Sequence, residues 1–195
     1  QREAWAATLR AAARASDMST FTQQLDPPLA LSGVCVVCVS PKYPHNVGAM
    51  ARAMNCFEAC DMRLVDPRAD RLERRARAAA KGAAHVLEGA SEYGTLREAL
   101  GVGVGASVAF ARWCDGPREG QRALAGTGDL ALEAERARAE GGKLALVFGR
   151  EDYGLTPEEV AECGARCSIP VGRLQESLSL SHAGVVVLAS LFAAA

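Results

Sequence analysis

The sequence predicts one α/β domain, a parallel β-sheet with helices on both faces. From residue 33 onward, short apolar segments rich in β-branched residues alternate with segments of helical pattern. The apolar segments lack the regular polar positions of a half-exposed strand, which is typical of parallel strands buried on both faces. The chain has 195 residues, of which 49% are hydrophobic, so it can form the core of one such domain with little left for a second.

Each predicted strand is a short apolar segment of residues that favour extended backbone. The first contains Val34-Cys-Val-Val-Cys-Val39, which is apolar at every position. Helical segments between the strands supply the crossovers that a parallel sheet needs. The five predicted strands cover residues 33–40, 61–66, 106–111, 143–148 and 166–170.

Helix start signals precede several of the helical segments. Asn46 is placed to cap a helix over 46–58. Thr95-Leu-Arg-Glu98 and Thr156-Pro-Glu-Glu159 have the pattern of capping boxes, so each is expected to open a short helix. The other predicted segments are a basic helix at 69–81, a charged surface helix at 129–140, a Gly-rich loop at 112–128 and a final apolar helix at 179–192.

Residues 1–30 are predicted to be separate from the domain at 31–195. They are rich in Ala, Arg, Ser and Thr and poor in acidic residues, which fits the tail of a chloroplast or mitochondrial transit peptide. An additional amphipathic helix over 2–15, followed by a linker at Pro27-Pro28, fits equally well. The location therefore stays open between the cytoplasm and an organelle.

The apolar C-terminal segment is predicted to be a buried or subunit-interface helix and not a membrane span. Residues 177–195 carry no formal charge, but the strongly apolar part covers only about 12 residues, too few to cross a bilayer.

Composition limits the possible partners. The 22 basic and 23 acidic residues give a net charge of −1, which excludes a uniformly basic nucleic-acid binder but allows a local basic patch. Aromatic residues make up only 5%, which argues against a chain lined with base-stacking platforms. The seven cysteines are expected to be free thiols and not metal ligands; Cys35 and Cys38, three apart on a strand, would point to opposite faces.

Ligands of parallel α/β sheets bind beyond the carboxyl ends of the strands, so the loops there carry the functional prediction. They cover residues 40–48, 111–115, 149–154 and 170–177. None of them contains the glycine fingerprint of a dinucleotide site or a P-loop, so generic nucleotide binding is not indicated.

Three motifs in these loops, taken together, resemble the SpoU-type branch of the SPOUT RNA methyltransferases. The first is Asn46-Val-Gly-Ala-Met-Ala-Arg52, the second Leu146-Val-Phe-Gly-Arg-Glu-Asp-Tyr-Gly-Leu155, and the third Ile169-Pro170 followed by Ser177-Leu-Ser-Leu-Ser181. The Gly-Arg-Glu-Asp form of the second motif is most similar to the TrmJ-like tRNA methyltransferases. The resemblance covers residues 31–195.

The resemblance implies a deep trefoil knot near the C-terminus, S-adenosylmethionine as cofactor, and a homodimer in which each active site borrows residues from the partner. It implies catalytic roles for Arg52, Asn46, Glu151 and Ser177. Because a guanidinium normally stays protonated, Arg52 is expected to hold the RNA phosphate beside the ribose hydroxyl instead of acting as a free base. By position, the implied cofactor-binding residues are Ala109, Phe110, Ala111, Gly149, Ile169, Glu176, Ser177 and Leu178.

Two positions depart from the family pattern. The third motif usually reads Ser-Leu-Asn, and here Ser179 replaces the asparagine, removing one donor–acceptor pair near the reaction site. At the end of the third strand, Ala109-Phe110 replaces the small hydroxyl residues common in relatives. The change at 179 motivates an alternative, a non-catalytic RNA-binding or cofactor-binding paralogue.

The prediction is therefore an S-adenosylmethionine-dependent RNA ribose 2′-O-methyltransferase, with tRNA favoured over rRNA and with no metal. Its RNA contacts are expected on residues 66–82, which hold six basic and three acidic side chains for a local net charge of +3. Arg71, Arg74 and Arg75 are expected on one helical face, because their spacing is i, i+3 and i+4. With Arg68 they form the predicted phosphate-binding surface.

Overall fold

Seven parallel strands form a single sheet in a computed structural model that describes residues 29–111 and 121–195. The strand order is β3-β2-β1-β6-β4-β7-β5, so β1 and β6 lie near the middle and β3 and β5 at the edges. The strands are β1 (Val34–Val39), β2 (Asp61–Val65), β3 (Ser91–Tyr93), β4 (Val104–Phe110), β5 (Arg122–Leu124), β6 (Lys143–Phe148) and β7 (Ala165–Cys167).

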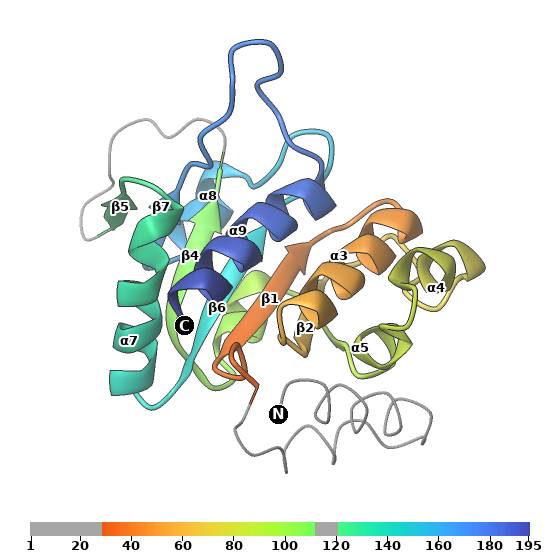
Figure 1. Cartoon of the computed structure of the whole chain (residues 1–195), viewed down its shortest axis with the longest axis horizontal. Helices are drawn as coiled ribbons and strands as arrows, with labels where there is room; N and C mark the ends of the chain where they lie inside the picture. Colours follow the sequence, from red (N-terminus) through yellow and green to blue (C-terminus); the bar gives the residue numbers. More distant parts are fainter. Residues whose placement is uncertain (1–28, 112–120) are drawn as a thin grey trace.

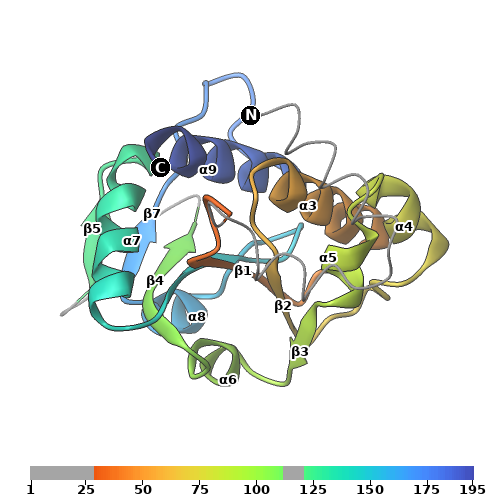
Figure 2. The same ribbon diagram turned by 60° about the horizontal axis from the view of Figure 1, so that its bottom comes forward.

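Helices cover both faces of this sheet (Figures 1 and 2). One face packs against α3 (Pro44–Cys56), α4 (Arg74–Ala80), α5 (Ala84–Glu88), α7 (Leu130–Ala139) and α9 (Leu180–Ala194). The other face packs against α6 (Leu96–Leu100) and α8 (Pro157–Ala161). A short 3-10 helix, η1 (Thr127–Asp129), precedes α7. The predicted α/β fold with a parallel sheet between helices is confirmed.

Strand β1 shows why the predicted strands are apolar at every position: their side chains pack into the cores on both faces of the sheet. Val36 and Cys38 belong to the core under α3 and α9, whereas Cys35 and Val37 belong to the core under α6 and α8. Cys35 and Cys38 therefore point to opposite sides, as their spacing predicts. Burial raises the pKa of each thiol to about 12. Within the described ranges all six cysteines are free, and no group of three His, Cys, Asp or Glu side chains could hold a metal ion.

Helix α3 begins earlier than the sequence indicated, and the prediction of Asn46 as its N-cap is wrong. Pro44 takes the first turn and Tyr43, with extended backbone, is the N-cap residue. Proline suits this place because its fixed φ is helical and the N–H it lacks would have no partner there. Asn46 consequently lies inside the first turn, where its side chain is free to bond elsewhere.

The basic helix is also shorter than predicted. The Asp70 carboxylate accepts the Leu72 N–H at 2.8 Å, a local turn that competes with the helix, and α4 begins only at Arg74. Arg71 therefore precedes the helix and does not share a helical face with Arg74 and Arg75. The expectation of one arginine face over these three residues is wrong.

Several short elements were missed by sequence analysis. β3 and β5 have three residues each and α5 has five, too few for a periodic pattern to be recognised. β5 and the start of η1 lie in the predicted loop at 112–128, of which 112–120 fall outside the described residues. The two predicted capping boxes are confirmed, with Thr95 and Thr156 each accepting the backbone N–H of the glutamate three residues later.

The final apolar helix, α9, lies against α3 and the sheet. Val187, Leu188 and Leu191 are buried in the core, while Val185, Val186 and Phe192 remain exposed. In the parts of the chain that the structure covers, no helix is both long and apolar enough to span a membrane. The predicted leader at 1–30 falls almost wholly outside the described residues.

Candidate functional site

A cavity of about 720 Å³ lies at the carboxyl ends of β4, β6 and β7. Its size is in the range of small-molecule sites, and its position is where parallel α/β sheets bind their ligands. The segment between β7 and α9 forms one wall and extends beyond the sheet in Figure 1. The lining residues come from 110–111, 148–155, 168–173 and 176–178, with Leu180 and Ala183.

The cavity combines two phenylalanine side chains with a tight backbone turn. The rings of Phe110 and Phe148 are stacked with their centroids 4.8 Å apart. Gly149 follows directly, and a Cβ there would come within 2.1 Å of the Gly154 carbonyl carbon. Gly154 itself has a φ of 75°, which favours glycine. The turn from Gly149 to Gly154 thus depends on both glycines.

Most of the cofactor-binding residues implied by the resemblance line this cavity. Ala109 does not, because its side chain is buried in the core under α6 and α8, on the opposite side of the sheet from Phe110. Cofactor binding remains a prediction for all of them. Those that line the cavity are Phe110, Ala111, Gly149, Ile169, Glu176, Ser177 and Leu178.

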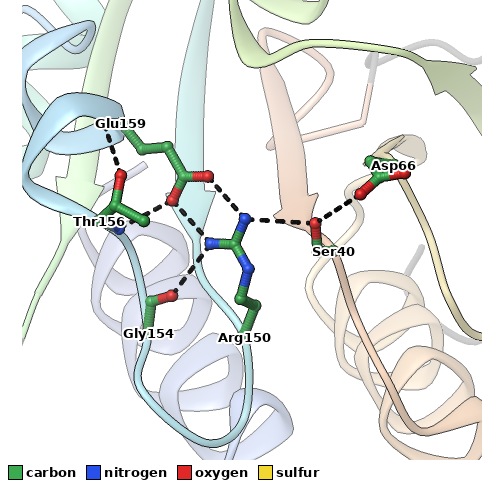
Figure 3. Close-up of polar contacts among 6 residues, drawn as sticks. All are labelled: Ser40, Asp66, Arg150, Gly154, Thr156 and Glu159. Atoms are coloured by element: carbon green, nitrogen blue, oxygen red, sulfur yellow. Dashed lines mark hydrogen bonds and ion pairs between the residues drawn. The ribbon is translucent and has the colours of Figure 1, made fainter.

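Arg150 holds the cavity turn to its neighbours (Figure 3). Its guanidinium donates two hydrogen bonds of 2.8 Å to the Glu159 carboxylate on α8 and a longer bond of 3.3 Å to Ser40 Oγ at the end of β1. Ser40 in turn donates to Asp66, after β2. Burial alone would raise the pKa of Glu159, but the bonds from Arg150 and from the Thr156 N–H outweigh it and hold that pKa below its usual range.

Glu151 fixes the same turn to the start of α3. Its carboxylate accepts the backbone N–H of Lys42 at 2.9 Å, that of Tyr43 at 3.3 Å and Asn46 Nδ2 at 3.0 Å. A carboxylate at a helix N-terminus is favoured by the unpaired amides and the helix dipole. Lys42 and Asp152 form an ion pair between the same two loops. The second motif is therefore attached to the first.

Arg52 lies apart from this network. It is exposed on α3 and is not among the residues that line the cavity. Its guanidinium makes no hydrogen bond or ion pair to any residue that the structure describes, and the Glu151 carboxylate accepts hydrogen bonds from Lys42, Tyr43 and Asn46. Within one chain, the structure does not bring Arg52 and the cavity together.

The third motif starts α9. Ser177 is exposed at the cavity, and its Oγ accepts a hydrogen bond of 3.0 Å from Gln175. Ser179 is the N-cap of α9, where its Oγ accepts the His182 N–H at 3.3 Å and lies 2.8 Å from His182 Nδ1. Asparagine caps helices as well as serine does, so the departure at 179 preserves the cap.

The predicted phosphate-binding arginines differ in their exposure to solvent and in their contacts within the fold. Arg68, Arg74 and Arg75 are exposed. The Arg71 side chain instead donates to the Leu87 carbonyl at 2.9 Å and forms an ion pair with Glu92. RNA binding by these residues remains a prediction, and Arg71 already has partners within the fold.

Sequence reasoning did not assign Arg150, Glu159, Lys42 and Asp152 to the site. The sequence pattern predicts the Thr156–Glu159 capping box. It does not predict that Glu159 also pairs with Arg150, because that contact depends on how the turn packs against α8. The ion pair of Lys42 with Asp152 joins positions 110 residues apart, so no local pattern shows it.

Fold and site together define a class, the α/β proteins with a parallel sheet whose ligand cavity is built from loops at its carboxyl edge. A family model described as the SpoU rRNA Methylase family matches residues 33–189. The chain therefore belongs to the SpoU methylase family.

Three similar proteins illustrate the relationship. The tRNA (cytidine-2′-O-)-methyltransferase TrmJ of Methanocaldococcus jannaschii is 33% identical over 160 residues, which are 82% of this chain and 67% of that protein. The tRNA (cytidine/uridine/adenosine-2′-O-)-methyltransferase TrmJ of Pseudomonas aeruginosa is 37% identical over 162 residues, 78% of this chain and 58% of that protein. The crystal structure of a probable methyltransferase from Bordetella pertussis matches with a TM-score of 0.76 and 32% identity, covering 85% and 97% of the two chains.

The chain spans between 57% and 67% of the length of the first curated relatives.

Proposed function

We propose that this protein is an S-adenosylmethionine-dependent methyltransferase that modifies a ribose 2′-hydroxyl in tRNA. The observation that carries the proposal is the cavity at the carboxyl edge, which two of the three motifs line and to which Glu151 joins the first. Family membership over residues 33–189 and relatives named as tRNA 2′-O-methyltransferases support it. We assign the activity to residues 31–195.

The cavity fits S-adenosylmethionine. Its volume of about 720 Å³ can hold a nucleoside with an amino-acid chain, and the Phe110 and Phe148 rings give it an apolar part. A Cβ at position 149 would meet the backbone of Gly154 and Leu155, so the tight turn that lines the cavity requires glycine there. When bound, the cofactor supplies a methyl group on a cationic sulfur.

Arg52 is assigned to the substrate ribose. Transfer of that methyl group to the 2′-hydroxyl oxygen would require the hydroxyl to lose its proton to solvent. A guanidinium remains charged, so Arg52 orients the adjacent RNA phosphate and stabilises the alkoxide character that develops on the oxygen. Asn46 and Glu151 keep the start of α3 fixed to the cofactor turn, and Ser177 lies where the cavity opens.

A homodimer explains how Arg52 can act in catalysis although it is exposed and lies apart from the cavity of its own chain. Helix α9 exposes Val185, Val186 and Phe192, and the Phe192 ring lies 5.8 Å from that of Phe57 at the end of α3. We propose that this apolar surface pairs with its copy, so that Arg52 of one protomer completes the cavity of the other. The trefoil knot implied by the family is part of the same proposal, with the segment between β7 and α9 as the knotted loop.

Calorimetry tests the cofactor assignment. Titration of the purified protein with S-adenosylmethionine should give saturable binding that Gly149→Ala weakens at least tenfold, because the added Cβ displaces the turn. A protein that binds no S-adenosylmethionine would contradict the proposal and favour the non-catalytic paralogue.

Mixed dimers test the shared active site. Arg52→Ala and Gly149→Ala should each be inactive as purified homodimers. When the two are co-expressed, heterodimers hold one intact site, and roughly a quarter of wild-type activity should return if assembly is random. No recovery from heterodimers of demonstrated composition would contradict an Arg52 supplied by the partner.

A further inference from the structure

Two exposed tyrosines lie in the loops that follow β1 and β6, and one of them, Tyr153, lines the cavity. The sequence holds only three tyrosines, and Tyr43 and Tyr153 are 57% and 62% exposed. Tyr93 is half-buried and packs against the core. The exposed rings contribute little to the core, so core packing does not explain these two tyrosines. A role in ligand binding is the alternative.

The loops that carry the two tyrosines are attached to each other. Tyr43 directly follows Lys42, and Tyr153 directly follows Asp152, the two partners of the ion pair between the loops. The Tyr43 N–H also donates to the Glu151 carboxylate at 3.3 Å. The two tyrosines therefore lie on loops that are joined to each other, and Tyr153 also lines the cavity.

The Tyr153 ring has a fixed cation behind it. The Arg150 guanidinium carbon lies 5.1 Å from the ring centroid, within the range of a cation–π contact. Arg150 is itself held by its two bonds to Glu159 and by Ser40, as Figure 3 shows. The ring is thus supported on one side while more than half of the residue remains open to solvent, and it also lines the cavity.

The Tyr153 ring is planar, exposed to solvent and supported by Arg150, and it lies beside the cavity proposed for methyl transfer. Such a ring can stack against a nucleobase. Proteins that recognise RNA at single nucleotides splay a base out of its stack and stack it on an aromatic side chain. We propose that Tyr153, with Tyr43 as a second wall, forms a stacking subsite for the base of the target nucleotide, positioning its ribose at the cavity. This inference rests on the proposed function, because it takes RNA as the substrate.

Tyrosine substitutions test the subsite. A stacked base contributes about 1–3 kcal/mol, so Tyr153→Ala should raise KM for tRNA by about 5- to 140-fold and leave kcat nearly unchanged. Tyr153→Phe keeps the ring and should stay within threefold of wild type. Tyr43→Ala should raise KM in the same direction. Leu132→Ala, at a 53% exposed residue on α7, is the control and should change nothing.

Binding measurements separate the possible outcomes. The dissociation constant for S-adenosylmethionine should stay within twofold in Tyr153→Ala, whereas labelled oligocytidylate should bind more weakly by the same factor as the change in KM. Weaker S-adenosylmethionine binding would place the ring in the cofactor site, and equal defects in the Phe and Ala variants would point to the phenolic hydroxyl; either result overturns the subsite. If wild-type protein methylates tRNA and Tyr153→Ala does so equally well, the subsite alone is refuted. If wild-type protein methylates no RNA, the proposed function is refuted.

Discussion

The Asn46 side-chain amide donates a 3.0 Å hydrogen bond to Glu151, although the two residues are 105 positions apart. Asn46 belongs to the first motif and Glu151 to the second. The same carboxylate accepts the Lys42 and Tyr43 amides that precede α3. This acidic side chain thus joins the start of the helix that carries Arg52 to the cavity turn.

Glu151→Ala should lower the free energy of unfolding by about 1–3 kcal/mol, because it leaves the amides at the start of α3 without their acceptor. Denaturant titration followed by circular dichroism measures the change. Asp152→Asn is the matched control on the same loop, because its partner Lys42 is exposed and such pairs contribute little. A Glu151→Ala variant as stable as wild type would show that this carboxylate does not hold α3.

The Arg150–Glu159 pair should make stability depend on pH in the acidic range. The pKa of Glu159 is held below its usual value near 4.5, so its contribution is fully present above that pH and is lost as pH falls through the lower, folded-state value. The difference in unfolding free energy between wild type and Glu159→Gln should therefore shrink below pH 4.5. Glu135→Gln, exposed on α7, controls for general charge effects. A difference that stays constant from pH 7 to pH 3 would argue against the pair.

Thiol reactivity should follow burial. Burial raises the pKa of Cys35, Cys38 and Cys163 to about 12, so these thiols are protonated as well as inaccessible at pH 8. Among the cysteines that the structure describes, the exposed Cys56 should be modified by iodoacetamide first, and Cys35, Cys38 and Cys163 should react only after unfolding. Peptide mass mapping after timed labelling checks the order, and early modification of Cys35 or Cys38 in the folded protein would contradict the core described for β1.

Ser179 should act as a helix cap before any other role. Ser179→Ala should cost about 1 kcal/mol of stability, whereas Ser179→Asn, which restores the family residue, should stay within a few tenths. Thermal unfolding of the two variants beside Ser181→Ala measures this. If Ser179→Asn also raises methyl transfer severalfold, the missing amide limits the rate; equal rates would show that the hydroxyl suffices.

Sequence analysis predicted the fold well where patterns are local. The buried strand Val34–Val39 and the capping box at Thr156 follow from residue type and spacing, and both are confirmed. Asn46 is not the N-cap that its residue type predicts, because the proline two residues earlier starts the helix sooner. Arg71 was misplaced because Asp70 forms a turn that delays α4.

The site was less accessible to sequence reasoning, because its contacts join distant segments. The motif residues at 149, 169 and 176–178 do line one cavity. The pairing of Arg150 with Glu159 and of Lys42 with Asp152 depends on loop geometry that no spacing reveals. Low aromatic content argued against base stacking, yet two of three tyrosines are exposed at the site. The overall percentage of aromatic residues does not show where the few aromatic side chains lie in the fold.

The most direct test of the central claim is methyl transfer from S-adenosylmethionine, labelled in its methyl group, to unmodified tRNA, followed by nuclease mapping of the product. Wild-type protein should place the label on a ribose 2′-oxygen. Arg52→Ala should reduce the rate at least a hundredfold while its circular dichroism spectrum and S-adenosylmethionine affinity match those of wild type. Label on a base, or full activity in Arg52→Ala, would contradict the account.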